Sequence, residues 1–288
     1  MEGGESSRLL FQLHERRFEQ NRFVYPVVSR RSRGVSVGVN LNPDKICNFD
    51  CIYCQVNRTT PAEQTFVEMD RLLDELREIC RVTQSGELFE HPKFAATPPH
   101  LRRFNDIAFS GDGEPTTYRN FDEIIAACAE VRAQFANPDV KMVLITNASM
   151  FHRPHVQRGL VILDQNHGEI WAKLDAGTED YFKLIERTSI PFQQILDNLL
   201  LAALQRPIVI QSLFMKVHGE GPSDHEIMEF AGRLNHIISR GGKISLVQIY
   251  TVARTPAESW VTPLEQSAVE RIASLVQTET ALTATAFV

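Results

Sequence analysis

Short apolar runs alternate with longer amphipathic stretches along most of this chain. The short runs are rich in Val, Ile and Leu and are typical of buried β-strands, whereas the stretches between them repeat apolar residues at helical spacing. Strands are expected at residues 35–40, 106–110, 141–146, 169–174, 207–214 and 243–250. Helices are expected at residues 61–82, 120–134, 153–159, 191–204, 223–239 and 264–276. About six strand-helix units predict an α/β fold with a parallel sheet, which can close as a barrel or stay open as a doubly wound sheet.

The same pattern divides the chain into three parts. Residues 1–33 are expected to form an N-terminal arm with a helix and an Arg-rich turn, residues 34–277 a single strand-helix domain, and residues 278–288 a tail. The tail is small and rich in Thr and Ala, so it is expected either to add an edge strand or to fray. Residues 85–103 interrupt the alternation with three prolines and polar side chains, which favours an irregular loop over a lid.

Charge and hydropathy narrow the function classes only a little. No apolar run approaches the ~20 residues of a membrane span, and the first residues lack the basic flank and apolar stretch of a secretory signal, so we expect a cytoplasmic protein with no membrane partner. The net charge of -6 argues weakly against a surface dedicated to nucleic-acid phosphates. Residues 1–34 are locally positive, however, with seven arginines against four glutamates. A solvated helix and turn is the expected explanation, and contact with RNA phosphates is the alternative.

The five cysteines fall into two groups. Cys80 and Cys128 each lie in an amphipathic helical pattern, where a buried thiol behaves as a small hydrophobic side chain, so both are expected in the core. Cys47, Cys51 and Cys54 follow a C-x3-C-x2-C spacing after the first expected strand. Three thiolates this close in sequence can hold one soft metal centre.

The number of thiolate ligands decides which kind of metal centre is favoured. A structural zinc site normally has four protein ligands, and here a fourth would have to come from a remote residue such as His91 or His100. A cubic four-iron cluster usually takes four thiolates, so three leave one iron open for an external ligand. An electron-transfer cluster is disfavoured by the missing fourth cysteine, and no second C-x-x-C set predicts an auxiliary cluster.

Polar side chains end or interrupt several of the expected strands. The second strand ends in FSGDGEPTTY, the third in LITNAS and the fourth in WAKLDAG, and the last two strands carry Gln211 and Gln248. Because the C-terminal ends of parallel strands gather on one rim, these side chains are expected near one another. The structural alternatives are an ordinary Gly-rich turn, a helix cap at Asn147, and mutual pairing of Lys173 with Asp175.

At the cysteine loop the sequence resembles the radical S-adenosylmethionine (radical SAM) superfamily, whose hallmark is C-x3-C-x-aromatic-C with Tyr53 here as the aromatic residue. Five runs, SRRSRG, NLNPDKICNFDCIYCQV, SGDGEPT, KLDAGTEDYF and YTVARTPAE, resemble the Fe-S oxidoreductase group of that superfamily, which includes relatives of the wyosine-base-forming tRNA enzymes. The resemblance covers residues 29–263. It implies a partial parallel (β/α)6 TIM-like barrel with right-handed crossovers.

The resemblance also implies a site. Cys47, Cys51 and Cys54 would hold one 4Fe-4S cluster, and S-adenosylmethionine would bind its open iron. SGDGEPT resembles the superfamily's Gly-Gly-Glu-Pro segment, from which it departs at Asp112. The positions implied to contact the cofactor are Tyr53, Gly111, Asp112, Gly113, Glu114, Asn147, Lys173, Asp175 and Gln211.

The implied activity is reductive cleavage of S-adenosylmethionine to a 5'-deoxyadenosyl radical, which acts on a small-molecule or RNA substrate that the sequence does not identify. An external one-electron reductant of flavodoxin or ferredoxin type is expected as a partner. The motifs assign no catalytic side chain. A tRNA- or RNA-modifying enzyme of wyosine-like type is one alternative, with the arginine-rich arm beside the barrel mouth on the RNA phosphates. A metal-stabilised binding module without turnover is the other.

Overall fold

A computed structural model of the chain describes residues 18–135, 137 and 139–288. The helix expected within the N-terminal arm, and Arg8, Arg16 and Arg17 with it, lie outside the described residues. The chain forms two compact units, which we describe separately. Of the described residues, the first unit contains 18–46, 61–135, 137, 139–144 and 155–169, and the second contains 47–60, 145–154 and 170–288.

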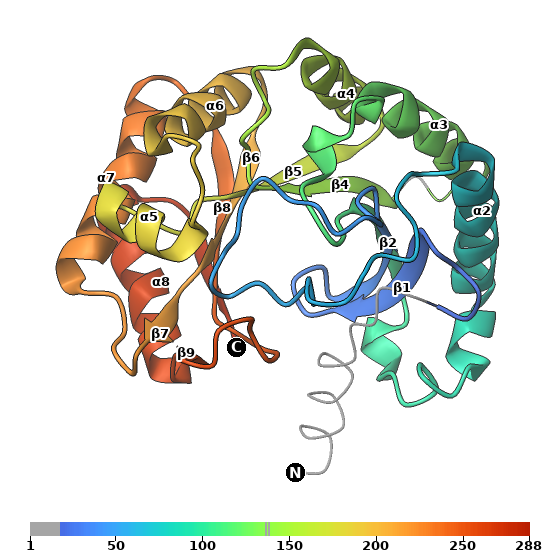
Figure 1. Cartoon of the computed structure of the whole chain (residues 1–288), viewed down its shortest axis with the longest axis horizontal. Helices are drawn as coiled ribbons and strands as arrows, with labels where there is room; N and C mark the ends of the chain where they lie inside the picture. The colour runs from blue at the N-terminus through green and yellow to red at the C-terminus, as the bar shows by residue number, and fades with distance from the viewer. Residues whose placement is uncertain (1–17, 136, 138) are drawn as a thin grey trace. The chain divides into compact units, whose positions relative to one another are not determined.

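The first unit is built on a mostly parallel sheet. β1 (Val24–Ser29) pairs antiparallel with β2 (Gly34–Val39), and β3 (Phe104–Phe109) pairs parallel with both β2 and β4 (Lys141–Thr146). Three helices belong to this unit, and α2 and α3 pack against each other beside the strands (Figure 1): α2 (Met69–Ser85), α3 (Phe121–Gln134) and most of α4 (Pro154–Gln165). β1 lies within the expected arm and was not among the expected strands.

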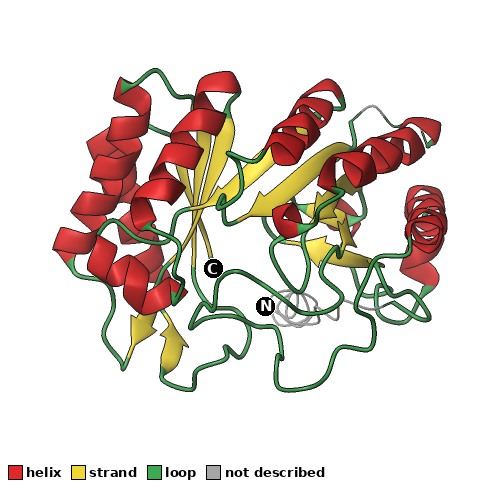
Figure 2. Ribbon diagram, turned by 45° about the horizontal axis from the view of Figure 1, so that its top comes forward, coloured by secondary structure: helices red, strands yellow, loops and turns green. Residues whose placement is uncertain are grey.

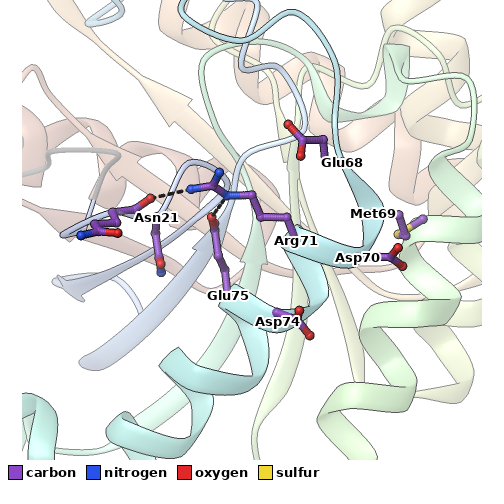
Figure 3. Close-up of a pocket in the computed structure, with 8 residues that line it drawn as sticks. Asn21, Glu68, Met69, Asp70, Arg71, Asp74 and Glu75 are labelled. Carbon is purple, nitrogen blue, oxygen red and sulfur yellow. Dashed lines mark hydrogen bonds and ion pairs between the residues drawn. The ribbon is translucent and has the colours of Figure 1, made fainter.

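A buried carboxylate connects β1 to α2. Glu75 accepts hydrogen bonds from the backbone N–H groups of Arg22 at 3.0 Å, Phe23 at 2.8 Å and Val24 at 3.1 Å. Arg71, one helical turn earlier, donates to the same carboxylate at 2.9 Å. Figure 3 shows Glu75 and Arg71 side by side in a shallow pocket at the start of α2. The start of β1 is therefore fixed by hydrogen bonds to one side chain, because an ionised carboxylate can accept several at once.

The segment from residue 85 to residue 103 is a packed loop. It contains two 3-10 turns, Glu87–Glu90 and Pro99–Leu101. Leu88 and Phe94, which belong to this segment, are buried. These apolar anchors explain how a loop rich in proline and polar residues keeps one conformation.

The second unit also carries a parallel sheet, whose helices flank its strands (Figure 2). Its strands are β5 (Gly168–Lys173), β6 (Ile208–Leu213), β8 (Ile244–Tyr250) and β10 (Ala284–Phe287), each parallel to the next. Its helices are α5 (Glu179–Glu186), α6 (Phe192–Gln205), α7 (Asp224–Ser239) and α8 (Gln266–Thr280). A separate antiparallel pair joins β7 (Met215–Val217) to β9 (Val261–Pro263). β10 comes from the C-terminal tail, which thus adds a strand to the sheet.

The arginine-rich turn lies at one end of the first unit's sheet. Arg30, Arg31 and Arg33 occupy the connection between β1 and β2, at the N-terminal end of β2. Residues 111–114 follow the C-terminal end of β3, which runs parallel to β2. Within this unit the three arginines and the 111–114 loop are therefore at opposite ends of the strands, rather than together at one rim. Among the helices that the structure describes, none is both long and apolar enough to cross a membrane.

Asp106 on β3 is a buried carboxyl group at the end of the sheet where the arginine turn lies. It is 3% exposed and accepts a short hydrogen bond from the hydroxyl of Ser36 on β2. Burial raises the pKa of Asp106 to about 6. The native state therefore holds this proton more tightly than the unfolded chain, where an Asp pKa is about 3.9.

We predict that Asp106→Asn stabilises the protein at pH 7.5 and has little effect at pH 4. As the pH rises through the window between the two pKa values, the wild type loses up to about 3 kcal/mol of unfolding free energy, because its buried carboxyl must ionise. Asn keeps an acceptor for Ser36 and has no charge to bury. Urea unfolding at the two pH values measures the difference, with Asp197→Asn on the exposed face of α6 as control. An Asp106→Asn effect of equal size at both pH values would contradict the prediction.

Candidate functional site

The cysteine loop, residues 47–54, belongs to the second unit and is held by backbone hydrogen bonds. The N–H of Asp50 donates to the carbonyl of Glu186 at 3.1 Å, and the N–H of Ile52 donates to the carbonyl of Ile185 at 2.9 Å. Ile52 itself is fully buried. A loop without helix or strand is thereby fixed at its centre, because its backbone donors are paired with the end of α5.

Asn48 anchors the first half of the cysteine loop. Its side-chain oxygen accepts a hydrogen bond from Asn147 at 2.9 Å, and its side-chain amide donates to the hydroxyl of Ser149 at 2.7 Å. Asn147 also accepts from the N–H of Ser149 at 3.0 Å. The predicted site residue Asn147 therefore contacts the cysteine loop and closes a local turn at the same time.

The three cysteines of the loop are half-buried, and none of them forms a disulfide. Cys51 donates to the carboxylate of Glu186 at 2.7 Å, and Arg58 lies 3.6 Å from the sulfur of Cys54. Burial, and then the charge of Glu186, raise the pKa of the Cys51 thiol. Within the described ranges, no three His, Cys, Asp or Glu side chains are gathered so that they could hold a metal ion. The donor set nevertheless fits a soft metal centre in kind, since three reduced thiols lie in one short loop.

Tyr53 is the centre of a buried polar cluster. Its hydroxyl accepts a hydrogen bond from the ammonium group of Lys173 at 2.7 Å. The same hydroxyl makes a short hydrogen bond to Asp175 and lies 3.0 Å from an oxygen of Glu186. Lys173 also pairs with Asp175 at 3.0 Å and lies 4.4 Å from the centre of the Tyr53 ring. One cation thus faces two carboxylates and a phenol, and all four side chains are largely withdrawn from water.

Proton positions in this cluster follow from its composition. Tyr53 has one hydroxyl proton, so it can donate to only one carboxylate at a time. Burial, and then the charge of Asp175, raise the pKa of Glu186, which favours a protonated Glu186. Burial by itself lowers the pKa of Lys173, but the charges of Asp175, Tyr250 and Glu186 outweigh it and raise the pKa, so the lysine stays charged. Burial and the neighbouring Asp175 also raise the pKa of Tyr53.

Glu186 was not among the predicted site residues. It is 2% exposed and touches both Cys51 and Tyr53. A signal existed in the sequence, because Glu186 lies four residues after Phe182 and therefore on the apolar face of the short helix α5. A carboxylate on an apolar helical face is costly unless it has a partner.

Gln211 occupies a row of polar residues across the second unit's sheet. Lys173, Gln211 and Gln248 are register partners on β5, β6 and β8, so their side chains point to the same face. The amide of Gln211 donates to the side-chain oxygen of Gln248 at 2.9 Å. The side-chain oxygen of Gln211 is buried and has no hydrogen-bond partner within the described part of the chain. Asp175, two residues after Lys173, accepts from the N–H of Leu213 at 2.7 Å.

The remaining predicted residues, Gly111 to Glu114, form a tight loop in the first unit. Asp112 accepts a hydrogen bond from the amide of Asn40 at 2.7 Å and donates its N–H to the oxygen of that side chain at 3.1 Å. Glu114 is 3% exposed and accepts from the N–H of Thr116 at 3.1 Å, which caps the following 3-10 turn. The Asp112 side chain, which departs from the family pattern, is therefore bound to the end of β2.

Two glycines allow this loop to pack closely. A Cβ atom on Gly111 would lie 2.1 Å from the side-chain oxygen of Asn40. A Cβ atom on Gly113 would lie 2.1 Å from the carbonyl oxygen of Ile46 and 2.8 Å from Asn42. Ile46 is the residue before Cys47, so Gly113 packs against the backbone that leads into the cysteine loop. Only a residue without a side chain fits at either position.

The other two cysteines are separate from these features. Cys80 on α2 and Cys128 on α3 are fully buried in the first unit. Burial raises the pKa of Cys80 to about 12 and raises that of Cys128 as well. Both thiols are therefore unreactive core side chains at neutral pH.

Comparison with known proteins gives distant relatives. No family model matches the chain. A Brachyspira hyodysenteriae protein described as GTPase Obg is 28% identical over 180 residues, which cover 61% of this chain and 22% of that protein. A Helicobacter pylori protein described as a UPF0026 protein is 27% identical over 236 residues, which cover 80% of this chain and 65% of that protein. The chain thus spans less than two thirds of the length of each of these relatives, and its printed sequence contains no G-x4-G-K-[ST] phosphate-binding run.

Solved structures resemble the chain over most of its length. A point mutant of spore photoproduct lyase matches with a TM-score of 0.58 and 9% identity, covering 96% of this chain and 87% of that one. Streptococcus suis SuiB bound to S-adenosylmethionine matches with a TM-score of 0.55 and 13% identity, covering 90% and 49%. TYW1 with a lysine-pyruvate adduct matches with a TM-score of 0.51 and 15% identity, covering 96% and 81%. At identities this low the likeness shows the fold alone, and at that level the predicted partial TIM-like barrel of the radical SAM superfamily is confirmed.

We predict that Lys173→Met lowers the free energy of unfolding by about 3–5 kcal/mol, because it leaves the buried carboxylate of Asp175 without its cation. Thermal or urea unfolding measures the loss. Lys183→Met is the matched control, since Lys183 pairs with Glu179 on the exposed side of α5 and should matter by at most about 0.5 kcal/mol. Equal losses for the two variants would contradict the interpretation of the buried cluster.

We also predict that Gly113→Ala destabilises the protein by about 1–3 kcal/mol, because the added methyl group meets the carbonyl of Ile46 and the backbone must shift. Gly232→Ala on α7 is the control, because a Cβ atom there meets nothing within 4 Å. Alanine at that helical position should leave stability unchanged or raise it by up to about 1 kcal/mol. Urea unfolding compares the two variants, and a Gly113→Ala protein as stable as wild type would contradict the packing argument.

Proposed function

We propose that this chain, which has the fold of the radical SAM enzymes, holds one 4Fe-4S cluster on Cys47, Cys51 and Cys54 and binds S-adenosylmethionine beside it. The proposed reaction is reductive cleavage of S-adenosylmethionine to a 5'-deoxyadenosyl radical, which then acts on a small molecule or an RNA. The electron comes from an external reductant of flavodoxin or ferredoxin type. The proposed location is the cytoplasm, where thiols are kept reduced.

One observation carries the proposal. Tyr53, the aromatic residue of the cysteine motif, is hydrogen-bonded to Lys173 and Asp175, which follow it by 120 and 122 residues. The sequence resemblance implies a cofactor contact for each of these three residues independently. Their convergence next to the cysteine loop supports a site for a zwitterionic ligand, because it offers a cation, a carboxylate and an aromatic face together.

When bound, the cluster would supply the electron that cleaves S-adenosylmethionine. The chain's own residues bind and orient the cofactor. The Lys173 ammonium is the proposed partner of the cofactor carboxylate, Asp175 is the proposed partner of its ribose hydroxyls, and the ring of Tyr53 would lie against its adenine. Since one oxygen of Asp175 is held by the N–H of Leu213, its other oxygen is the one that exchanges Tyr53 for the ligand.

The Gly-rich loop of the first unit supplies further proposed contacts. Gly111 and Gly113 expose backbone where side chains are sterically excluded, and a ligand can therefore approach the peptide groups closely. Glu114 is the proposed partner of the cofactor's methionyl amine. One of its oxygens already accepts from the N–H of Thr116, which fixes the orientation of the carboxylate. Asn147 and Gln211 complete the proposed set.

The position of the turn arginines bears on the RNA alternative. Arg30, Arg31 and Arg33 lie at the end of the first unit's strands opposite to residues 111–114. RNA held by these arginines would therefore be bound at the far end of the strands from the Gly-rich loop. The RNA substrate remains an alternative that this arrangement does not favour.

We predict that the anaerobically reconstituted chain takes up a reducible iron-sulfur cluster whose EPR spectrum changes when S-adenosylmethionine is added. Replacing Cys47, Cys51 or Cys54 by Ala should abolish the cluster, since each removes one of three thiolate ligands. Cys128→Ala is the control and should retain it, because that thiol is buried in the core of the first unit.

Product analysis under reductant separates an enzyme from a metal-stabilised binding module. We expect 5'-deoxyadenosine and methionine from the wild type and neither from the three cysteine variants. A cluster that persists without these cysteines, or an EPR spectrum that is indifferent to S-adenosylmethionine, would refute the proposed function.

A further inference from the structure

The segment Ile185–Thr188, at the C-terminal end of α5, contacts the cysteine loop along its length. We infer that this segment is the template on which the cysteine loop is built, and that Glu186 is the positioning residue for Cys51 and Tyr53. Only the part of the inference that concerns cluster assembly rests on the proposed function.

The backbone part of the template follows from how a helix ends. The last four carbonyl groups of an α-helix have no partner within the helix. α5 ends at Glu186, and Arg187 takes a left-handed conformation with φ of 43°, which stops the helix there. The carbonyl groups of Ile185 and Glu186 accept from the N–H groups of Ile52 and Asp50. The helix end and the loop therefore satisfy each other's backbone groups.

The side chains of the next two residues hold the outer edge of the loop. Arg187 donates to the carbonyl of Asp50 at 2.8 Å and pairs with Glu258 at 2.6 Å. The hydroxyl of Thr188 donates to the carbonyl of Asn48 at 2.9 Å. Residues 48, 50 and 52 of the loop are thus all bound by the template through their backbone. The alternate side chains of Cys51 and Tyr53 are left to meet Glu186.

Glu186 holds these two side chains with one carboxylate. One of its oxygens lies 2.7 Å from the sulfur of Cys51, and the other lies 3.0 Å from the hydroxyl of Tyr53. At 2% exposure the carboxylate is withdrawn from water, so these contacts replace its solvation. The protein's own hydrogen bonds therefore shape the loop, and ligation by Cys51 would require its thiol to leave Glu186.

Cysteine alkylation in the metal-free chain tests the inference directly. The reduced full-length protein is treated with iodoacetamide, and the modification of each cysteine is followed by mass spectrometry. In Glu186→Ala we expect Cys51 to react about tenfold faster, the effect of losing one hydrogen bond to a carboxylate, while Cys47 and Cys54 change by less than about twofold. Glu186→Gln keeps an acceptor oxygen and should return Cys51 to within about threefold of wild type.

Two internal references make the result decisive. Glu226→Ala is the matched control, because Glu226 is a buried carboxylate of the same unit that accepts from Thr178 at 3.2 Å instead of from the cysteine loop. Cys80 and Cys128 report unfolding, because they react only when the core opens. An unchanged Cys51 rate in Glu186→Ala, or equal acceleration of all five cysteines, would overturn the positioning role.

Iron content after anaerobic reconstitution extends the test to the cluster. We expect Glu186→Ala to take up less iron and sulfide per chain than wild type, with recovery in Glu186→Gln and no loss in Glu226→Ala. If the wild type takes up no cluster while the alkylation pattern is as expected, the proposed function fails and the template stands. Wild-type iron content in Glu186→Ala would overturn the template's role in cluster assembly.

Discussion

In the second unit, the cysteine loop and the sheet are joined through contacts to one buried cation. Lys173 is the ammonium group that faces Asp175 at 3.0 Å and the hydroxyl of Tyr53 at 2.7 Å, and Glu186 touches the same hydroxyl. Two carboxylates cannot both be charged beside one cation in a site without water, so one of them must hold a proton. The cluster also links the cysteine loop to β5, because Tyr53 lies in the loop and Lys173 lies on the strand.

The buried acidic side chains discussed above are stabilised in three different ways. Glu75 is held by backbone N–H groups and an arginine, and Glu226 by backbone N–H groups, so several donors satisfy each carboxylate at a fixed place. Asp106 has a short contact to Ser36, and burial raises its pKa to about 6. Glu186 combines burial with a neighbouring carboxylate. The two well-satisfied acids anchor the fold, whereas the acid that touches a thiol is at the proposed site, where perturbed groups tend to gather.

Much of the fold was predictable because its strands are continuous apolar runs. The strand expected at residues 141–146 is found at those residues, and the others differ by one or two residues at their ends. β1 was missed because Pro26 interrupts its pattern, and proline is tolerated there because β1 pairs on only one side within the first unit. α5 was missed because it is short and lies close after a strand. The motifs identify their own residues, but no motif includes Glu186, because its partners come from a loop more than 130 residues earlier.

The buried cluster implies that a ligand must compete with the protein's own hydrogen bonds. Two of the groups proposed to bind S-adenosylmethionine are the Lys173 ammonium and one oxygen of Asp175, and both are already engaged with Tyr53 and with each other. The other oxygen of Asp175 is fixed by the N–H of Leu213, so the carboxylate can change partners without changing its place. Binding therefore exchanges hydrogen bonds of similar kind, and the net gain is the difference between two satisfied states rather than the sum of the new contacts. Release of the Tyr53 hydroxyl from Asp175 leaves Glu186 as its acceptor, so the template residue stabilises the same ring in both states.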